Sequence, residues 1–409
     1  MTRGMSTRRS FARPLTVFLA AAFVVGLVPP VQAGMENDLS PEGDVSSFLT
    51  WKPKDKDDEG VNFAVLPQLG FGPETGPKAG VKFEGRDLFG GHTFADLNLL
   101  YALQLQQKAE LVLGAPQFGG DGRFMLFGTL AYKRDPSMEF FGIGNNDVGP
   151  TPLSNHDIRR GRVGLTLGYR LLRRFAIAMT AFYRETDIKP GNDGDQPSTT
   201  RFAPDLPGIG GARSNYLALA FVYSSRDEVV RPTKGWEATL KFLSADQALF
   251  NDDADFHKLI GDVSYIMPLG WRRQLIALRA NGEAIFGDEE DIPFFELSHL
   301  GGDDTMRGYF PQRFLGKGRL LLNAEYRLKL VDFNFRDIWD ITIDGVGFGD
   351  AGRVYEDDED FTRHFASRIR LSYGGGVRIG FHTGLVARID VGFSPEETGL
   401  IYLTFGHIF

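Results

Sequence analysis

Apolar and polar residues alternate along segments of about ten residues, from Val61 to the end of the chain. In the clearest segment, the apolar positions are Ile369, Leu371, Tyr373, Val377, Ile379 and Phe381, and the polar positions between them are Arg368, Arg370, Ser372 and Arg378. A period of two places successive side chains on opposite faces of a β-strand. The sequence therefore predicts strands with one apolar face and one charged face.

The same pattern of charge recurs in other segments. Leu385, Ala387, Ile389, Val391 and Phe393 alternate with Arg388 and Asp390, and Ile276, Leu278, Ala280 and Ala284 alternate with Arg279, Asn281 and Glu283. Unpaired charges are too costly to bury in a dry core, so we expect the charged face to line water and the apolar face to meet lipid. Strands in lipid must satisfy their backbone hydrogen bonds among themselves, which requires a closed barrel. The alternative is a soluble β-sandwich, whose faces would be less cleanly divided.

The fold class predicted is all-β, a transmembrane antiparallel barrel of about sixteen strands, an even number as in bacterial barrels. The predicted strands are 61–71, 78–86, 92–104, 107–117, 122–134, 157–170, 173–185, 213–225, 235–245, 256–267, 273–286, 318–331, 340–354, 367–381, 384–393 and 399–409. The long connections are predicted to face the cell exterior (135–156, 186–212, 246–255, 287–317 and 355–366). Short ones such as 268–270 and 382–383 are predicted to face the periplasm.

The first 33 residues have the pattern of a secretory signal. Four arginines precede an apolar run from Leu15 to Val28, and Val31-Gln32-Ala33 is typical of a cleavage site. A membrane anchor is the alternative, but a spanning helix needs about 20 apolar residues. Removal of residues 1–33 takes the formal net charge from −8 to −12, because the segment holds no acidic residue. This charge argues against a nucleic-acid partner.

Residues 34–60 are charged and lack periodicity, which predicts a flexible periplasmic leader before a barrel over residues 61–409. The chain has no cysteine, which suits an exported protein that needs no disulfide.

Residues 301–310 read Gly-Gly-Asp-Asp-Thr-Met-Arg-Gly-Tyr-Phe and lie in the longest predicted loop, and Phe348-Gly349-Asp350-Ala351-Gly352 lies in a predicted strand. The pairing of Arg307 with Asp350 would pin the loop inside the barrel by a charge-assisted bond. The alternation of residues 322–330 also turns Glu325 inward. Two lumenal carboxylates on neighbouring strands are therefore predicted to bind one loop cation.

These motifs resemble those of the BamA/TamA superfamily, the bacterial surface-antigen type of outer-membrane barrel. That family carries Val/Ile-Arg-Gly-Tyr/Phe in its sixth extracellular loop and Phe-x-Asp-x-Gly on a partner strand. Matching residues here are Arg307, Gly308, Tyr309, Phe348, Asp350 and Gly352, while Met306 departs from the β-branched preference. The resemblance implies that the sixth loop folds into the lumen and is held there by these residues together with Glu325.

Two further elements are similar to the same family. The turn from Ser225 to Trp236 resembles its Arg-Asp…Pro-Thr-x-Gly element through Arg226, Asp227, Pro232 and Gly235. The chain ends in alternating residues that include Tyr402, Phe405 and Phe409, and this ending resembles the insertion signal by which the barrel assembly machinery recognises its clients.

The resemblance implies a protein of the Gram-negative outer membrane that acts in protein insertion, export or envelope homeostasis. Its expected partners are outer-membrane lipid and lipopolysaccharide, the assembly machinery during biogenesis, and client proteins or a periplasmic partner. The family usually carries POTRA domains before its barrel, and residues 34–60 are too short for one, so we expect a member without them. A passive pore or structural barrel is the alternative function, and a hydrolase at the barrel rim is a further one.

Other motifs favour ordinary structural roles. Residues 347–352 satisfy G-x-G-x-x-G, but strand and acidic-loop residues follow them instead of a helix. The acidic clusters at Asp252, Asp253 and Asp255 and at residues 288–291 could bind divalent cations near lipopolysaccharide, but they lack the calcium-loop spacing and are typical of solvated loops. The seven histidines show no zinc spacing, and G-x-S-x-G is absent. No catalytic residue, metal or cofactor is predicted.

Deletion of Phe409, or its replacement by a charged residue, is expected to lower the yield of folded barrel without altering synthesis, because an aromatic end anchors the last strand at the membrane interface. The measurement is the fraction of heat-modifiable protein on gels of unboiled membranes. Phe409→Tyr is the control, since it keeps the aromatic ring. Equal folded fractions in wild type and deletion would contradict the expectation.

Overall fold

The computed structural model describes residues 62–88, 93–118, 122–146, 149–191, 196–228, 231–247, 253–270, 273–335, 339–365, 367–381 and 386–405. Within these residues sixteen antiparallel strands close into one barrel, each paired with its neighbours in the chain and the first paired with the last. The predicted signal (1–33), the predicted leader (34–60) and the terminal Phe409 lie outside the described residues.

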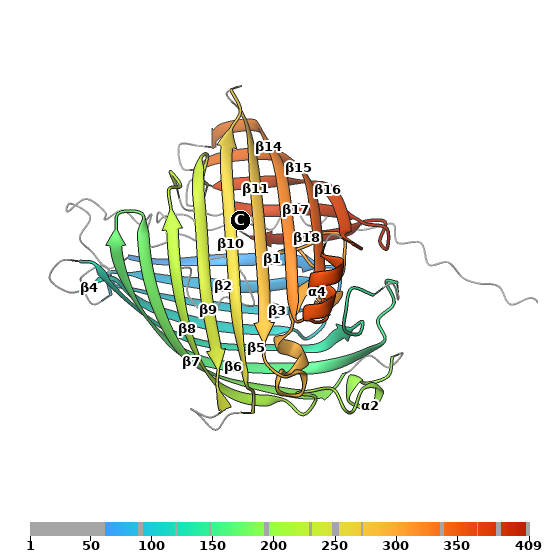
Figure 1. The fold of residues 1–409 in the computed structure, drawn as a ribbon. Helices are drawn as coiled ribbons and strands as arrows, with labels where there is room; N and C mark the ends of the chain where they lie inside the picture. Colours follow the sequence, from blue (N-terminus) through green and yellow to red (C-terminus); the bar gives the residue numbers. More distant parts are fainter. Residues whose placement is uncertain are drawn as a thin grey trace, which may run out of the picture.

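The barrel strands follow the chain in order (Figure 1). Those of the first half are β1 (Asn62–Gly72), β2 (Gly76–Arg86), β3 (Phe94–Ala102), β4 (Gln107–Phe118), β5 (Phe124–Phe140), β6 (Ser154–Leu172), β7 (Phe175–Pro190) and β8 (Ala212–Ser224). Those of the second half are β9 (Gly235–Ala245), β10 (Phe256–Pro268), β11 (Gln274–Phe286), β14 (Gly318–Phe335), β15 (Trp339–Tyr355), β16 (Arg370–Phe381), β17 (Val386–Phe393) and β18 (Leu400–Phe405). All sixteen predicted strand segments correspond to these strands.

The remaining elements lie in the long connections. The connection from β11 to β14, residues 287–317, is named the long loop here; it holds η2 (Glu289–Asp291), η3 (Phe294–Glu296) and the two-stranded sheet of β12 (Ser298–Leu300) and β13 (Phe314–Gly316). Helices α2 (Thr199–Phe202) and α4 (Asp358–His364) lie at the same end of the barrel in Figure 1. No helix among the described residues is long and apolar enough to cross a membrane.

The alternation in the sequence becomes the two faces of the wall. Along β14, Leu322 and Tyr326 are 57% and 41% exposed on the outside, whereas Asn323 and Glu325 are 2% and 1% exposed on the inside. The registers of β14 with β11 and of β14 with β15 keep this parity from strand to strand. The lipid-facing and lumenal assignments made for this strand are therefore confirmed.

Three strands extend beyond their predicted limits at the end that carries the long connections. β5 and β6 run on to Phe140 and from Ser154, and β7 reaches Pro190. A cluster of buried apolar residues covers the inner face of these extensions, including Phe140, Ile158 and Ile188. The packing of the long loop on this cluster extends the strands where the sequence shows only loop-like composition.

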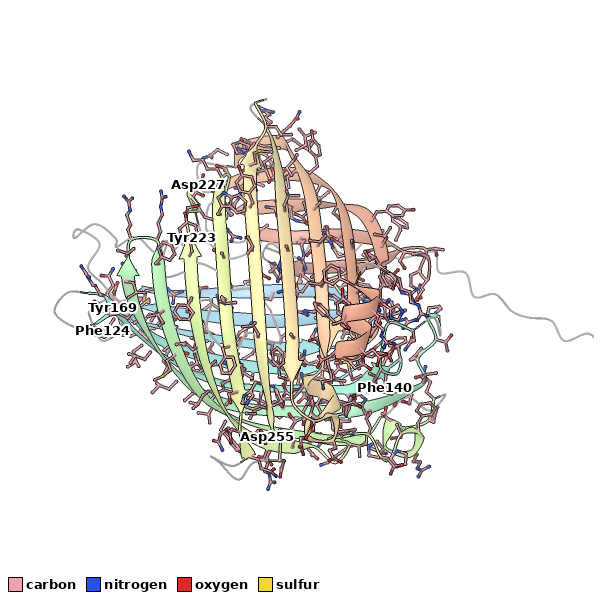
Figure 2. The ribbon with its side chains drawn as sticks, viewed as in Figure 1. Phe124, Phe140, Tyr169, Tyr223, Asp227 and Asp255 are labelled. Atoms are coloured by element: carbon pink, nitrogen blue, oxygen red, sulfur yellow. The ribbon has the colours of Figure 1, made fainter. Side chains whose placement is uncertain are left out.

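Aromatic pairs mark the end that carries the short turns. Phe124 packs on Tyr169 and Phe175 on Tyr223, with ring centroids 4.9 and 4.8 Å apart, and Trp236 stacks on Tyr265 at 4.1 Å. Figure 2 places Phe124, Tyr169 and Tyr223 at the end opposite to Phe140 and Asp255. Such pairs are typical of the aromatic girdle of a membrane barrel.

The expectation that the charged faces line water is wrong for the wall formed by β14 to β17. Glu325, Asp350, Arg378 and Asp390 are at most 2% exposed, because the long loop folds into the lumen against them. The charges neutralise one another inside the protein, which meets the same energetic requirement without solvent.

Candidate functional site

The long loop carries Arg307 onto the inner wall of the barrel. Its Nε donates to Asp350 Oδ2 at 2.9 Å and its Nη2 to Asp350 Oδ1 at 2.8 Å, a bidentate arrangement. Its Nη1 donates to Glu325 Oε1 at 2.6 Å, and its backbone N–H donates to Asp350 Oδ2 at 3.1 Å. The side chains of all three residues are 0% exposed. The structure thus brings together the cation and both carboxylates that the sequence analysis selected.

The neighbouring strands extend this contact into a network. Arg378 on β16 bonds Glu325 at 3.1 Å and Asp390 on β17 at 2.6 Å, and Arg327 bonds Glu325 at 2.7 Å. Arg388 on β17 donates to Asp303 of the long loop at 2.7 Å. Sequence reasoning placed Arg378, Arg388 and Asp390 on the polar face but did not connect them to the loop. The parity of their strands was the available signal.

The glycines and aromatics of the two motifs allow the loop to approach this closely. The Arg307 guanidinium lies 3.5 Å from the ring centroid of Phe348, a cation–π contact. Gly308 has φ +97°, and a Cβ there would lie 2.8 Å from the backbone of Phe393. A Cβ at Gly352 would lie 2.8 Å from Sδ of Met306, which is fully buried. Each motif glycine therefore occupies a position where a side chain would clash.

Arg307 is charged in spite of its burial. Burial alone lowers the pKa of the Arg307 guanidinium, but the nearby Asp350 and Glu325 carboxylates outweigh this and raise the pKa above its ordinary value. The proton is thus held by the negative charges around it.

The tip of the loop also contacts the last strand of the barrel. Gly308 N–H donates to the hydroxyl of Tyr402 on β18 at 3.2 Å, and the same hydroxyl donates to the carbonyl of Tyr309 at 3.1 Å. The Tyr309 hydroxyl donates to the carbonyl of Leu371 on β16 at 3.2 Å. The loop tip is therefore bonded both to the wall and to the strand that closes the barrel.

A second anchor of the long loop was not identified from the sequence. Residues 292–297 pack into the apolar cluster on the inner face of β5 to β10. Among them Glu296 is 2% exposed and binds Arg184 of β7 at 2.5 Å, Lys258 of β10 at 3.4 Å, and the hydroxyl of Tyr216 of β8 at 3.2 Å. The run Ile292-Pro293-Phe294-Phe295-Glu296-Leu297 is unusually apolar for an exposed loop, and that was the signal available.

The environment of Glu296 favours its ionised form. Burial raises its pKa, but the positive charges of Arg184 and Lys258 outweigh burial and lower the pKa from 4.5 to about 2. A carboxyl group whose pKa is lower in the folded state than in the unfolded state stabilises the fold above the unfolded pKa. That stabilisation is lost as the pH falls through the folded pKa.

Arg313, which the sequence analysis left on the outside of the loop, is in fact 1% exposed. Its Nε donates to Glu396 of the β17–β18 connection at 2.7 Å, and its Nη1 donates to Asn146 of the β5–β6 connection at 2.9 Å. Gly144 N–H also donates to the carbonyl of Leu315 at 2.6 Å. Three connections interlock over this end of the barrel, which a single loop sequence cannot reveal.

The turn between β8 and β9 is held by its own motif residues. The Asp227 carboxylate accepts from the N–H groups of Thr233 at 2.9 Å and Lys234 at 3.2 Å. Arg226 pairs with Glu237 at 3.3 Å, and Gly235 has φ +120° with no room for a Cβ beside the Ser225 carbonyl. Pro232 lies between Arg231 and Thr233 in the returning limb.

Two of the three C-terminal residues that the sequence analysis selected lie within β18. Tyr402 is 2% exposed and points into the lumen, whereas Phe405 is half-buried. Their part in an insertion signal remains a prediction.

The other motifs take structural positions. Residues 347–352 lie inside β15, so no helix starts at this G-x-G-x-x-G. Ser154, His156 and Thr199 form a rim contact in which Thr199 Oγ1 lies 2.9 Å from Ser154 Oγ and 3.3 Å from His156 Nδ1. All three are at most 2% exposed, so this hydroxyl–imidazole contact offers no accessible nucleophile. Within the described residues, no group of three or more His, Asp or Glu could hold a metal ion.

Comparisons with known proteins agree with this geometry. The model of the Omp85 superfamily domain matches residues 87–409. The chain is similar in structure to BamA from Haemophilus ducreyi lacking POTRA domains 1-3, with a TM-score of 0.59 and 14% identity over 84% of this chain and 70% of that chain. It is also similar to CdiB from Escherichia coli (TM-score 0.55, 12% identity, 85% and 67%) and to CdiB from Acinetobacter baumannii (0.53, 11%, 85% and 59%). At these identities the likeness concerns the fold.

Arg307→Ala is expected to destabilise the folded barrel and release the loop tip, because it leaves Asp350 and Glu325 enclosed without their cation. Breaking such a buried pair typically costs about 3–5 kcal/mol. Arg307→Lys should restore only part of the loss, since an ammonium cannot present a planar fork. The measurement is the temperature at which the folded form converts on unboiled gels, with protease cleavage of the long loop.

Arg363→Ala is the control for this experiment, because the Arg363 side chain is 70% exposed and pairs with Glu359 on the surface of α4. Its conversion temperature should equal that of the wild type. An Arg307→Ala barrel as stable and as protease-resistant as the control would contradict the assigned role.

Glu296→Gln is expected to weaken the second anchor at neutral pH, because it leaves Arg184 and Lys258 without a carboxylate. The difference from wild type should shrink as the pH falls from about 4.5 to about 2, the interval between the ordinary and the folded pKa of Glu296. Protease cleavage of the long loop measured across this range tests it. A pH-independent difference would exclude the ionised carboxylate as the cause.

Proposed function

Because this chain belongs to the Omp85 superfamily, we propose that its barrel inserts or exports client polypeptides at the outer membrane. The family and fold place the barrel in the Gram-negative outer membrane. The proposed partners are unfolded clients, together with a periplasmic protein that delivers them. A contribution to envelope homeostasis would follow from either activity.

The observation that carries this proposal is the pairing at the seam. Among the described residues, Phe71↔Leu403 is the one pair of Cα partners that joins β1 to β18. By contrast, β1 and β2 share eleven pairs, and β17 and β18 share six. Little described ladder has to be broken to separate β1 from β18, and β1 would then present free N–H and C=O groups. Such an edge is a template for a strand of another chain.

The long loop supports this proposal because it connects the seam to the rest of the barrel. Its tip binds Tyr402 on β18, while Arg307 two residues away is fixed to β14 and β15. Movement of β18 would therefore have to break or carry along the hydrogen bonds at the loop tip. In this proposal the ionic network keeps one side of the seam in place while the other opens.

The alternatives have less support. A passive open pore needs a clear path, yet the long loop fills the lumen beside β14 to β17 and interlocks with two other connections. A rim hydrolase needs an exposed nucleophile, and the Ser154–His156–Thr199 contact is enclosed. A purely structural barrel is compatible with the same contacts, and the following experiment separates it from an insertase.

The absence of cysteine in the chain allows the seam to be locked specifically. Phe71→Cys with Leu403→Cys places two thiols on directly opposed residues of β1 and β18, within reach of a disulfide. Leu69→Cys with Ala79→Cys is the matched control on the β1–β2 ladder. Purified variants in phospholipid vesicles are given an unfolded eight-stranded outer-membrane barrel, and its folding is followed by heat modifiability.

We expect wild-type protein and the oxidised control to accelerate folding of the test barrel. The oxidised seam variant should lose the acceleration and regain it after reduction. Acceleration that survives the seam disulfide would exclude seam opening, and no acceleration by the wild type would exclude the insertase function for this client.

A further inference from the structure

The turn between β8 and β9, residues 225–234, contacts a distant part of the wall. Arg231 Nη1 donates to Thr342 Oγ1 on β15 at 3.1 Å, and its Nη2 lies 3.8 Å from Asp344 Oδ2 on the same strand. The guanidinium also covers Gly380 on β16, where a Cβ would lie only 2.8 Å from Arg231 Cζ. This contact is separate from the long loop and its network.

The strand order shows how far the turn reaches. Between β9 and β15 the wall contains β10, β11 and β14, and β16 is one strand further. Four spacings of about 4.8 Å correspond to roughly 19 Å along the wall. One arginine side chain does not cover that distance, so the backbone of the turn must leave the wall and cross the opening. Figure 2 places Asp227 at the end of the barrel that carries the short turns.

Both limbs of the turn are fixed where they leave the wall. Arg226 pairs with Glu237 of β9 at 3.3 Å and bonds Ser264 of β10 at 2.5 Å. Asp227 binds the returning limb through the N–H groups of Thr233 and Lys234. The turn is therefore held at its base, and its tip is directed across the lumen.

The receiving wall is prepared on the opposite side. Thr342 Oγ1 accepts from Arg231 and donates to Asp332 Oδ1 of β14 at 2.7 Å. Asp344 contributes a negative charge, and the absence of a side chain at Gly380 leaves a flat surface for the guanidinium. A cation, two carboxylates and a glycine thus meet from three separate strands and a turn.

We propose that the β8–β9 turn is a strap that closes the short-turn opening of the lumen, with Arg231 as its fastening. The strap holds β8 and β9 against β15 and β16 across the barrel. The long loop closes the other end, so each end of the lumen has its own closure. A passage along the lumen would require Arg231 to leave Thr342, Asp344 and Gly380.

Cross-linking tests the position of the strap. Arg231→Cys with Gly380→Cys is treated with a short bifunctional maleimide in native membranes, in a chain that has no other cysteine. Arg273→Cys with Gly380→Cys is the control, because Arg273 lies in the β10–β11 turn, which is nearer to β16 along the wall. We expect an intramolecular cross-link in the first pair and not in the control. No cross-link in either pair, or an equal yield in both, would overturn the proposed crossing.

Conductance in planar bilayers tests the closure. Arg231→Ala should raise the frequency of openings about twofold to tenfold, the factor that corresponds to one net hydrogen bond. Gly380→Val keeps Arg231 but displaces its guanidinium, so it should act in the same direction. Combining it with Arg231→Ala should add little, because both act on one contact. Arg363→Ala on α4 is the control and should resemble wild type.

The outcomes separate a closure from a fold-stabilising contact. A lower conversion temperature without any change in openings would mean that Arg231 only stabilises the barrel, and the closure would be rejected. Unchanged openings in both Arg231→Ala and Gly380→Val would reject it as well. Raised openings in both variants, with Arg363→Ala unchanged, support it.

Discussion

A guanidinium removed from water is stable only where carboxylates surround it, and here the barrel wall supplies them. Asp350, Glu325 and Asp390 come from β15, β14 and β17, and all three lie within 4 Å of Arg307. The strand registers fix these carboxylates, so the loop must fold inward to reach them. Once Arg307 is in place, separating it again would strand charges on both sides. The position of the whole long loop depends on this contact.

The second anchor works by different physics. Around Glu296, apolar side chains such as Phe294 and Leu297 provide burial, and one carboxylate bound by Arg184 and Lys258 sets the register. The two anchors grip opposite regions of the wall, β14 to β17 and β5 to β10. The loop therefore braces the barrel internally, on the side where the β1–β18 ladder is thin among the described residues. A barrel with a weakly paired seam gains rigidity from such an internal brace.

Sequence reasoning located the strands and one half of the site. Period-two alternation marks the strands because lipid and lumen impose opposite polarities on successive residues. Parity then selected Arg307, Asp350 and Glu325, which the structure brings into contact. The assignment of Arg313 to the exterior was wrong, and the contacts of Arg231 and Glu296 were not foreseen. Each of these residues binds a partner on a connection or strand that is not its neighbour in the sheet.

The sequence by itself determined the number of strands, their inner and outer faces and the polarity of each face, since these follow from local alternation and turn composition. It also selected a loop cation with two carboxylates, because parity is a local property. Only closure of the barrel decided which charges meet across the lumen, and whether they meet water or one another. Contacts such as Arg313 with Glu396 and Arg231 with Thr342 depend on the curvature of the whole wall. No periodicity within a single segment encodes that distance.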